Sequence, residues 1–289
     1  MSAGVLFDAP GPRARLRHNV LTLLGVVLIL LAAWFVWARF EDAGQWDGAL
    51  WKPFLDPEVW TGLILPGLWG TLSAAAVAAV LTLVFGVVFG LGRLSDHWWL
   101  RLPATWVVEF FRAIPVLIMI FFAQAGAFAL SGYVMPAFWA VVIGLTLYNG
   151  SVLAEVFRAG VQAVPRGQSE AAYALGLRKG GVMRLILLPQ AVTAMLPAIV
   201  SQMVVLLKDT ALGYIITYED LLNSGFRVIP ANYGNVIPAA IVVAAIYILI
   251  NLALGRLATW LERRSRRSRK STAATAKADP VVGVPPLGA

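Results

Sequence analysis

The amino-acid sequence predicts an all-α, polytopic membrane protein with about six transmembrane helices. Of its 289 residues, 60% are hydrophobic and 13% are charged, and the mean hydropathy is +0.78. Soluble domains carry about 25% charged residues, so this composition falls outside their range. A helix that crosses a bilayer needs about 20 apolar residues. Six runs meet or approach that length: 20–37, 64–91, 114–130, 135–154, 188–215 and 236–258.

The first run follows a basic segment, which raises the alternative of a cleaved signal peptide. Arg13, Arg15 and Arg17 precede it, but its apolar stretch leads into "WFVWARF" instead of a run of small residues. Signal peptides end in a small-residue cleavage site, so we interpret the first run as a transmembrane helix that is retained in the mature protein. This part of the chain divides into a basic cytoplasmic segment (1–19), an extra transmembrane helix (20–38) and an external loop (39–61).

The second and third runs begin the main transmembrane domain, predicted at 62–258. The second contains "TLSAAAVAAVLT" and leads to glycines at positions 86, 90 and 92. Small residues let helices approach closely in a bilayer, so we expect a tightly packed bundle or a subunit interface here. The third run follows Glu109 and Arg112, which at i and i+3 are spaced to form an ion pair where the helix begins.

Basic residues alternate between the loops, which predicts the topology. Segments 1–19, 92–101, 156–187 and 256–289 hold 18 of the 23 Lys and Arg residues, whereas the alternate loops carry seven of the 15 acids and only three Lys or Arg residues. Because short cytoplasmic loops retain Lys and Arg, both termini and the loop at 156–187 are expected in the cytoplasm. The net charge of +8 therefore reports topology and attraction to anionic lipid, not nucleic-acid binding. The tail at 259–289 is basic and then rich in small residues, which predicts disorder.

Within the 156–187 loop, "PRGQSEAAYALGLRKGG" reads as a short amphipathic helix. Pro165 suits a first helical turn, Glu170 lies toward the positive end of the helix dipole, and Gly176 stands where a left-handed cap would end the helix. Ala171 and Ala172 keep one flank small, so another surface can approach closely. The residues alone leave two readings open: a helix packed on its own bundle, or a docking surface for another protein.

The same segment resembles the "EAA" signature of bacterial ATP-binding-cassette (ABC) importer permeases. The signature positions are Glu170, Ala171, Ala172, Gly176, Ile186, Leu188 and Pro189. The stretches "AEVFRAGVQAVPRGQ", "LPQAVTAMLPAIV", "LLKDTALGYII", "FFRAIPVL" and "LWGTLSAAAVAAV" resemble the polar amino-acid subfamily, the glutamate, histidine and glutamine type. The start, "VLFDAPGPRAR", is similar to glutamate-type permeases of actinobacteria. The family's usual five-helix core, of type I, lacks the first helix and the basic tail of this chain.

The resemblance implies that the 156–187 loop couples the chain to a separate ATPase. In that role Glu170 pairs with a basic residue of the ATPase, Ala171 and Ala172 allow close packing, and Gly176 allows the turn. The adjoining Leu177 and Arg178 belong to the same coupling surface. The sequence contains no G-x-x-x-x-G-K-[ST] phosphate loop. ATP and Mg²⁺ are therefore expected on the partner, and this chain is expected to carry no cofactor, no metal and no catalytic residue.

Polar residues inside the spans are costly and mark candidate sites. Gln202 and Asp209 are seven residues apart on one helix face, Lys208 is offset by about 100°, and Asn149 lies in the fourth run. A Lys beside an Asp matches the charges of an amino acid, which predicts a substrate path, although mutual neutralisation or contact with a sister subunit is an alternative. Nearer the cytoplasm, Ser151, Glu155 and Arg158 share a helix face. Together with Glu109 and Arg112 they are expected to form a structural polar network.

These observations lead to one functional hypothesis and two alternatives. The hypothesis is a permease subunit of an ABC importer in the cell inner membrane that carries a polar amino acid, most simply glutamate. Its expected partners are an ATPase dimer, a second permease, identical or homologous, and an extracytoplasmic solute-binding protein. A secondary carrier or channel would show inverted repeats, and no repeat between halves is evident. An intramembrane enzyme is disfavoured because the chain has no Cys and no paired carboxylates at metal-ligand spacing.

Overall fold

The computed structural model describes residues 11–276, with the backbone alone described for residue 258 and residues 261–276. The described chain is helical and contains no β-strand. The longer helices are α1 (Pro12–Asp42), α4 (Leu65–Arg93), α5 (Trp98–Ala113), α6 (Val116–Ser131), α7 (Ala137–Gln162), α8 (Arg166–Ala174), α10 (Leu188–Asp209) and α13 (Val236–Ala276). Short ones are α2 (Gly48–Trp51), η1 (Lys52–Leu55), α3 (Pro57–Val59), η2 (Trp60–Ile64), α9 (Lys179–Gly181), η3 (Val182–Leu187), η4 (Thr210–Ile216), α11 (Leu221–Asn223), η5 (Ser224–Val228) and α12 (Ile229–Tyr233).

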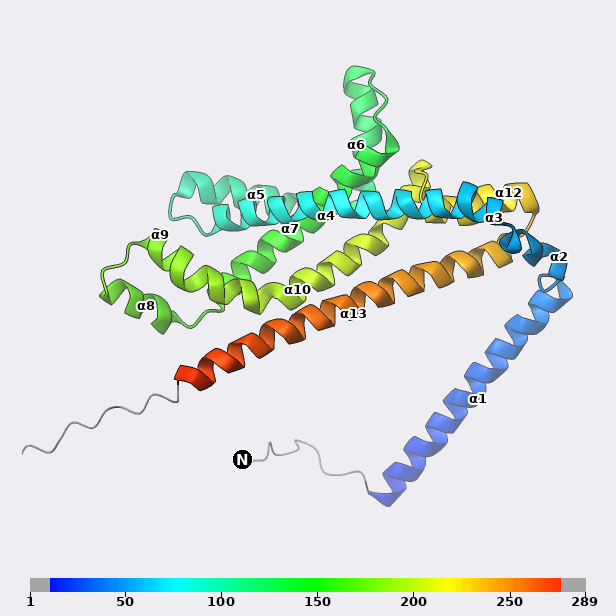
Figure 1. The fold of residues 1–289 in the computed structure, drawn as a ribbon, viewed down its shortest axis with the longest axis horizontal. Coiled ribbons are helices and arrows are strands. Elements are labelled where there is room, and N and C mark those ends of the chain that lie inside the picture. Colours follow the sequence, from blue (N-terminus) through cyan, green and yellow to red (C-terminus); the bar gives the residue numbers. More distant parts are fainter. Residues whose placement is uncertain (1–10, 277–289) are drawn as a thin grey trace, which may run out of the picture.

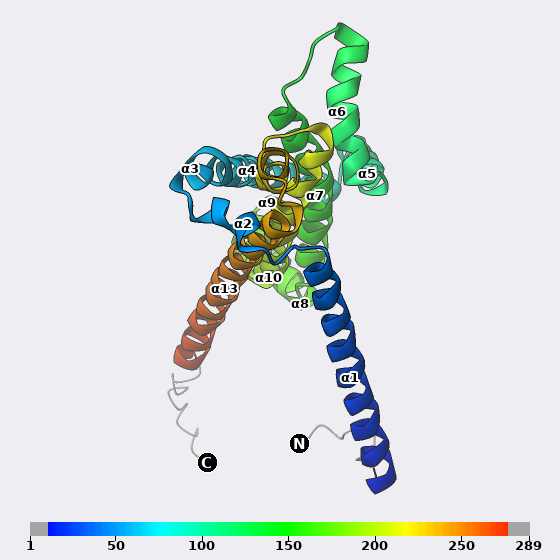
Figure 2. The same cartoon turned by 90° about the vertical axis from the view of Figure 1, so that its right-hand side faces the viewer.

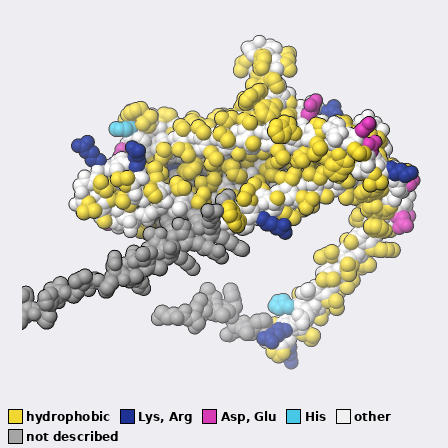
Figure 3. All heavy atoms as spheres, in the orientation of Figure 1, with side chains coloured by type: hydrophobic (Ala, Val, Ile, Leu, Met, Phe, Trp, Pro, Cys, Tyr) yellow, Lys and Arg dark blue, Asp and Glu magenta, His cyan; other side chains and the backbone are white. Residues whose placement is uncertain are grey.

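The predicted multi-span architecture is confirmed. Five helical segments are long and apolar enough to cross a membrane, and a bent pair, α5 with α6, raises the number to six if it counts as one span. Helices α4, α7, α10 and α13 run along a common direction, whereas α1 leans away from them (Figures 1 and 2). Hydrophobic side chains cover most of the visible bundle surface, as expected for contact with lipid (Figure 3).

Helices α4 and α7 form the tightest pair of the bundle. A Cβ added at Gly86 would lie 2.8 Å from the Cβ of Leu153, and one added at Gly90 would lie 2.9 Å from the Cβ of Phe157. Neither distance leaves room for a side chain, so the two glycines set the spacing of the helices. The expected close packing of this small-residue surface is thus present. In a bilayer such contacts stabilise through van der Waals attraction, since lipid tails are as apolar as the helix surfaces.

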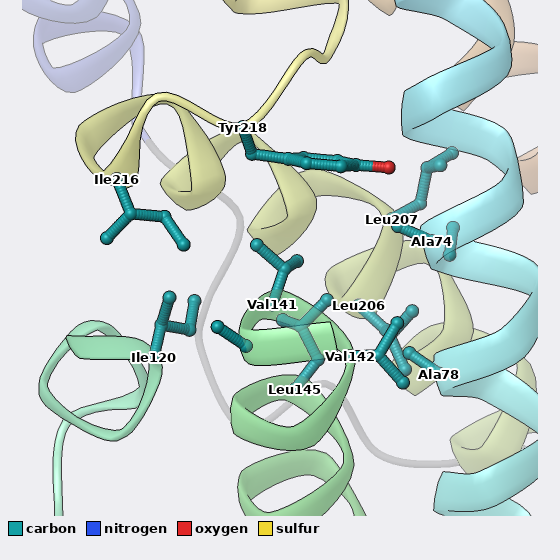
Figure 4. Close-up of a cluster of buried hydrophobic side chains, with 12 residues drawn as sticks. Ala74, Ala78, Ile120, Val141, Val142, Leu145, Leu206, Leu207, Ile216 and Tyr218 are labelled. Atoms are coloured by element: carbon teal, nitrogen blue, oxygen red, sulfur yellow. The ribbon is translucent and has the colours of Figure 1, made fainter. Parts of the chain in front are cut away.

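A central core joins the helices around α7. Buried side chains of α4, α6, α7, α10 and η4 meet here, together with Tyr218 (Figure 4). The labelled members are Ala74, Ala78, Ile120, Val141, Val142, Leu145, Leu206, Leu207, Ile216 and Tyr218. Small residues on α4 face larger aliphatic ones on α7 and α10, which lets the layers interdigitate at the density of a protein interior.

The run expected at 114–130 forms α6, and it is preceded by a helix, α5, that the sequence did not indicate. The chain breaks at Ile114–Pro115 and turns by 101° between the two helices. Ile114 is extended, with φ −93° and ψ 129°, because the residue before a proline is pushed away from helical backbone angles. Glu109 and Arg112 lie just before this break, as expected, in the last turns of α5.

The carboxyl-terminal helix also differs from expectation. Disorder was expected from residue 259, but α13 continues to Ala276. Residues 259–276 contain Arg, Lys, Ala, Leu and Glu but neither Gly nor Pro, so helix propensity alone favours continuation. The remainder of the predicted tail, 277–289, lies outside the described residues.

At one end of the bundle, the segment 217–235 packs on the start of α4. The Tyr218 hydroxyl donates to the Gly70 carbonyl at 2.8 Å, and the Leu221 amide donates to Thr71 Oγ1 at 3.0 Å. Most of the visible acidic side chains gather at this end, near α2, α3 and α12 (Figure 3). The segment that contains α8 and α9 lies at the opposite end (Figure 1).

Candidate functional site

Helix α8 projects from its end of the bundle and leaves apolar side chains uncovered. Leu175 is 82% exposed and Tyr173 is 48% exposed, whereas Ala172 is buried. Helix α8 packs on η3, the turn that leads into α10. The predicted short amphipathic helix is thus present. It is anchored on α10 through its small side and presents its larger apolar side chains outward, and exposed apolar groups of this kind mark interaction surfaces.

Gly176 ends α8 with a left-handed cap, as predicted. Its φ is +81°. The Gly176 amide donates to the Tyr173 carbonyl at 2.9 Å, and the Leu177 amide donates to the Ala172 carbonyl at 3.1 Å. This pair of bonds defines a Schellman motif. A Cβ at Gly176 would meet nothing within 4 Å, so the demand for glycine comes from the backbone angle and not from crowding.

The remaining predicted coupling residues lie on the same surface. Glu170, Ala171 and Arg178 are exposed, and Leu177 is half-buried. One expectation is wrong: no acidic residue lies in the first turn of α8, because the helix begins at Arg166 and Glu170 falls in the second turn. The influence of the helix dipole fades beyond the first turn. Glu170 is exposed, and from the second turn it contributes little to the stability of α8 through the helix dipole.

Three of the four residues predicted for the substrate path converge inside the bundle. Gln202 Nε2 of α10 donates to Asn149 Oδ1 of α7 at 2.6 Å, and the Asp209 carboxylate interacts with the same Asn149 side chain. Asn149 is fully buried and also donates to the Leu145 carbonyl at 3.1 Å. The shared helix face of Gln202 and Asp209 thus meets one amide on the neighbouring helix.

Lys208 lies apart from this cluster. It is exposed and lines a groove between α10 and α13, of about 480 Å³, together with Val204, Tyr247 and Asn251. Asn251 Oδ1 is buried and has no hydrogen-bond partner among the described residues. Lys208 and Asp209 are consecutive on a helix, and the offset between them places their side chains on two different surfaces of α10. They do not neutralise each other within this chain.

The predicted polar network forms, and its centre is a residue that the sequence did not indicate. Arg93, the last residue of α4, contacts Glu109 of α5 at 2.9 Å and Glu155 of α7 at 3.0 Å. Glu109 also pairs with Arg112, and Glu155 with Arg158. The Arg93 side chain is only 9% exposed, so it holds three helices together at the membrane edge. No spacing pattern reveals Arg93, because its partners are on other helices.

Ser151 is not part of this network. Its side chain is buried in α7, and its hydroxyl has no hydrogen-bond partner among the described residues. The i and i+4 spacing placed it on the face of Glu155, but the charged groups that join that face come from α4 and α5, nearer the end of the bundle.

In the part of the chain that the structure describes, no group of three or more His, Cys, Asp or Glu side chains is placed to hold a metal ion. The polar groups that converge among the described residues are two amides with one carboxylate, and a separate network of Arg–Glu ion pairs. They do not form the clustered acid, base and nucleophile of an enzyme site.

Comparison with known proteins agrees with this geometry. Residues 82–267 match the family model described as "Binding-protein-dependent transport system inner membrane component". The chain is 48% identical over 246 residues to a glutamate transport system permease protein of Corynebacterium glutamicum, an alignment that covers 83% of this chain and 89% of the relative. It is 33% identical to an arginine transport system permease protein of Bacillus subtilis, over 70% of this chain and 91% of that one.

Solved structures share the fold. A crystal structure of an amino acid ABC transporter with histidines superposes with a TM-score of 0.67 at 32% sequence identity, covering 71% of this chain and 95% of that chain. An inward-facing methionine ABC transporter superposes with a TM-score of 0.62 at 20% identity, covering 73% of this chain and 98% of that chain, and shows the fold alone.

Proposed function

We propose that this chain imports glutamate. It belongs to the family of binding-protein-dependent transport system inner membrane components, and it is the permease subunit of an ABC importer and not an enzyme. The observation that supports glutamate as the substrate is the 48% identity to a glutamate permease along most of both chains. The chain is a multi-pass membrane protein. Its two termini and α8 are proposed to face the cytoplasm, since the loops on that side hold most of the Lys and Arg.

Helix α8 is proposed as the coupling helix that docks on a separate ATPase dimer, which binds ATP and Mg²⁺. The support is the exposure of two apolar side chains, Tyr173 of α8 and Leu175 at its carboxyl-terminal cap, at the end of the bundle. Ala172 packs this helix against η3, which continues into α10. A movement of α8 is therefore passed directly to the helix that carries Gln202, Lys208 and Asp209.

Lys208 and the Asn149–Gln202–Asp209 cluster are proposed to line the substrate path. Lys208 offers a positive charge in a groove without a neutralising carboxylate among its lining residues, which suits a carboxylate of glutamate. The amides of Gln202 and Asn149 offer neutral hydrogen bonds. A complete path requires a second permease, identical or homologous, and a solute-binding protein that delivers glutamate to the side opposite α8.

The test is uptake of labelled glutamate into proteoliposomes that contain the permease pair and the ATPase. We expect uptake only with ATP and the binding protein, and we expect Lys208→Gln to reduce it at least tenfold, because a charged partner of the carboxylate is lost. Lys52→Gln, a Lys variant in the 39–61 loop, is the matched control. ATP-independent uptake by the chain alone would overturn the importer assignment. Uptake of arginine but not glutamate would overturn the substrate only.

A further inference from the structure

A second contact joins the coupling region to a part of the molecule that is far from α8 in the sequence. Lys179, the first residue of α9, forms an ion pair with Asp96 and donates from Nζ to the Leu94 carbonyl at 3.4 Å. Both acceptors belong to the turn Leu94–His97 that links α4 to α5. The hydrogen bond from Lys179 holds the pKa of Asp96 below its ordinary value, and the charge of Lys179 adds to this effect. Asp96 is therefore ionised at neutral pH.

An open groove lies between the two segments. It measures about 460 Å³ and is lined by residues of the Leu94–His97 turn and of α9, among others, and Asp96 and Lys179 both belong to its lining. The side chain of Lys179 thus connects the two sides of this groove. We refer to the Lys179–Asp96 ion pair together with the Lys179–Leu94 hydrogen bond as the strap.

The turn that receives the strap is itself fixed to the helix bundle. Leu94 and Ser95 donate from their amides to the Leu91 and Gly92 carbonyls at 3.1 and 3.2 Å, which continues the backbone bonding of α4. The residue before the turn is Arg93, the centre of the network that joins α4, α5 and α7. A displacement of Lys179 can thus be passed through the Leu94–His97 turn to Arg93, which contacts α5 and α7.

We propose that Lys179 and Asp96 are positioning residues, which make the Leu94–His97 turn a second point of transmission between the ATPase cycle and the membrane helices. The coupling helix moves α10 through η3, and the strap moves α4, α5 and α7 in step with it. This inference rests on the proposed coupling role of α8. It adds residues outside the EAA segment that determine how much transport each ATP hydrolysed drives.

Because the strap is exposed to solvent, a role in coupling can be distinguished from a role in folding stability. The side chains of Lys179 and Asp96 are 43% and 73% exposed, and exposed ion pairs contribute little to folding stability. Loss of the strap should therefore leave the thermal midpoint unchanged and instead change coupling. The ion pair should also weaken at high salt, since exposed charges are screened.

The experiment measures glutamate uptake and ATP hydrolysis together in proteoliposomes with the ATPase and binding protein. For Asp96→Asn and Lys179→Gln we expect two- to fivefold less glutamate transported per ATP, with an unchanged thermal midpoint. The exchanged pair Asp96→Lys with Lys179→Asp should recover at least half of the ratio. Arg101→Gln is the matched control, because it removes a neighbouring cation that forms no ion pair in the described structure.

A covalent replacement of the strap gives a second, independent readout. The sequence has no cysteine, so Asp96→Cys with Lys179→Cys introduces a unique thiol pair. A short bis-methanethiosulfonate linker suits it, because a lysine and an aspartate side chain in contact reach farther than a disulfide allows. We expect the linked protein to recover coupling and to lose it again on reduction.

The possible outcomes separate the two proposals. An unchanged transport ratio in both single variants, while glutamate uptake still requires ATP, would overturn the strap and leave the importer function intact. The strap would also be overturned if the single variants transported less glutamate per ATP but neither the exchanged pair nor the linker restored this ratio. The loss would then not depend on a link between positions 96 and 179. Uptake that never depends on ATP would overturn the proposed function itself.

Discussion

The two ends of the helix bundle are built in opposite ways. At the capped end, defined as segment 217–235 and the start of α4, polar groups are buried, and several bond within the chain. Asp220 Oδ2, Asn223 Oδ1 and Asn235 Oδ1 are buried without a hydrogen-bond partner among the described residues. Tyr218 and Asp220 are buried there, and a Cβ at Gly70 would lie 2.2 Å from the Glu219 carbonyl oxygen. At the coupling end, defined as α8, α9 and the Leu94–His97 turn, Leu175 and Lys179 are exposed and cavities remain.

This difference indicates which end of the bundle is stabilised mainly by contacts within the chain and which end is suited to contact with another protein. A surface that buries its side chains and packs to contact distance gains stability from its own residues. A surface with exposed apolar side chains and bridging charges gains little, and its sequence is suited to a partner. Substitutions at the capped end should therefore change stability, and those at the coupling end should change transport at unchanged stability.

The largest expected effect is at Gly176. Gly176→Asp should reduce glutamate uptake more than tenfold while the protein remains in the membrane, because a side chain at φ +81° costs about 1 kcal/mol or more and redirects the chain after α8. Uptake and membrane abundance are measured in the same cells. Gly176→Asn is the matched variant of nearly the same size, and it should retain more uptake because Asn is the residue that most often replaces Gly in a left-handed helix cap. Equal losses in both variants would point to a cause other than backbone geometry.

A change of one methyl group at the capped end should give the next largest effect. Gly70→Ala places a Cβ against the Glu219 carbonyl, and such overpacking costs about 1–3 kcal/mol. The thermal midpoint of the detergent-solubilised protein should fall. Gly62→Ala is the control, because a Cβ at Gly62 meets nothing within 4 Å. Equal midpoints for the two variants would show that the capped end is looser than described.

The smallest expected effect is a pH dependence at Asp220. Burial raises the pKa of Asp220 from 3.8 to about 6, and hydrogen bonds from backbone amides only partly oppose this. The folded state therefore binds the proton more tightly than the unfolded state. This contribution to stability is complete below about pH 4 and is lost as the pH rises through 6.

Asp220→Asn keeps an oxygen that can accept from the Asn223 amide, as Asp220 does at 2.7 Å, but carries no charge. At pH 7.5 it should be more stable than the native chain by up to about 2 kcal/mol, and the difference should disappear near pH 4. Thermal midpoints across that range provide the measurement. A native chain whose midpoint does not change between pH 4 and 7 would contradict the buried carboxylate.

Elements with a strong local signal could be predicted from the sequence. The long apolar runs predicted the membrane spans. The pattern from Pro165 to Gly176 predicted α8 and its left-handed cap, because the end of a helix depends on backbone geometry that a few residues determine. The glycines at 86 and 90 indicated close packing before their partner on α7 was known, since only a small surface allows it.

Helix α5 was missed because its sequence resembles a loop. It contains Pro103 and three charged residues, Arg101, Glu109 and Arg112, so its apolar positions fall below the composition of a span. Helix α5 buries Ala104 and Val108 and leaves its three charged residues exposed, which is the pattern of an amphipathic helix.

The candidate sites were predictable only within single helices. The i and i+7 relation of Gln202 and Asp209 was evident, but their meeting with Asn149 depends on how α7 packs against α10. Arg93 and the strap lay beyond reach for the same reason, since Lys179 and Leu94 are 85 residues apart. Long-range polar contacts carry no local pattern.

The measurement that tests the central claim most directly is the accessibility of position 175 in the assembled complex. Because the chain has no cysteine, Leu175→Cys carries a single thiol on the exposed face of α8. In inside-out vesicles stripped of the ATPase, a membrane-impermeant maleimide should label it fully, and rebinding the ATPase should protect it. Labelling that the ATPase leaves unchanged, or that occurs only from the opposite side of the membrane, would contradict the docking of α8 on the ATPase.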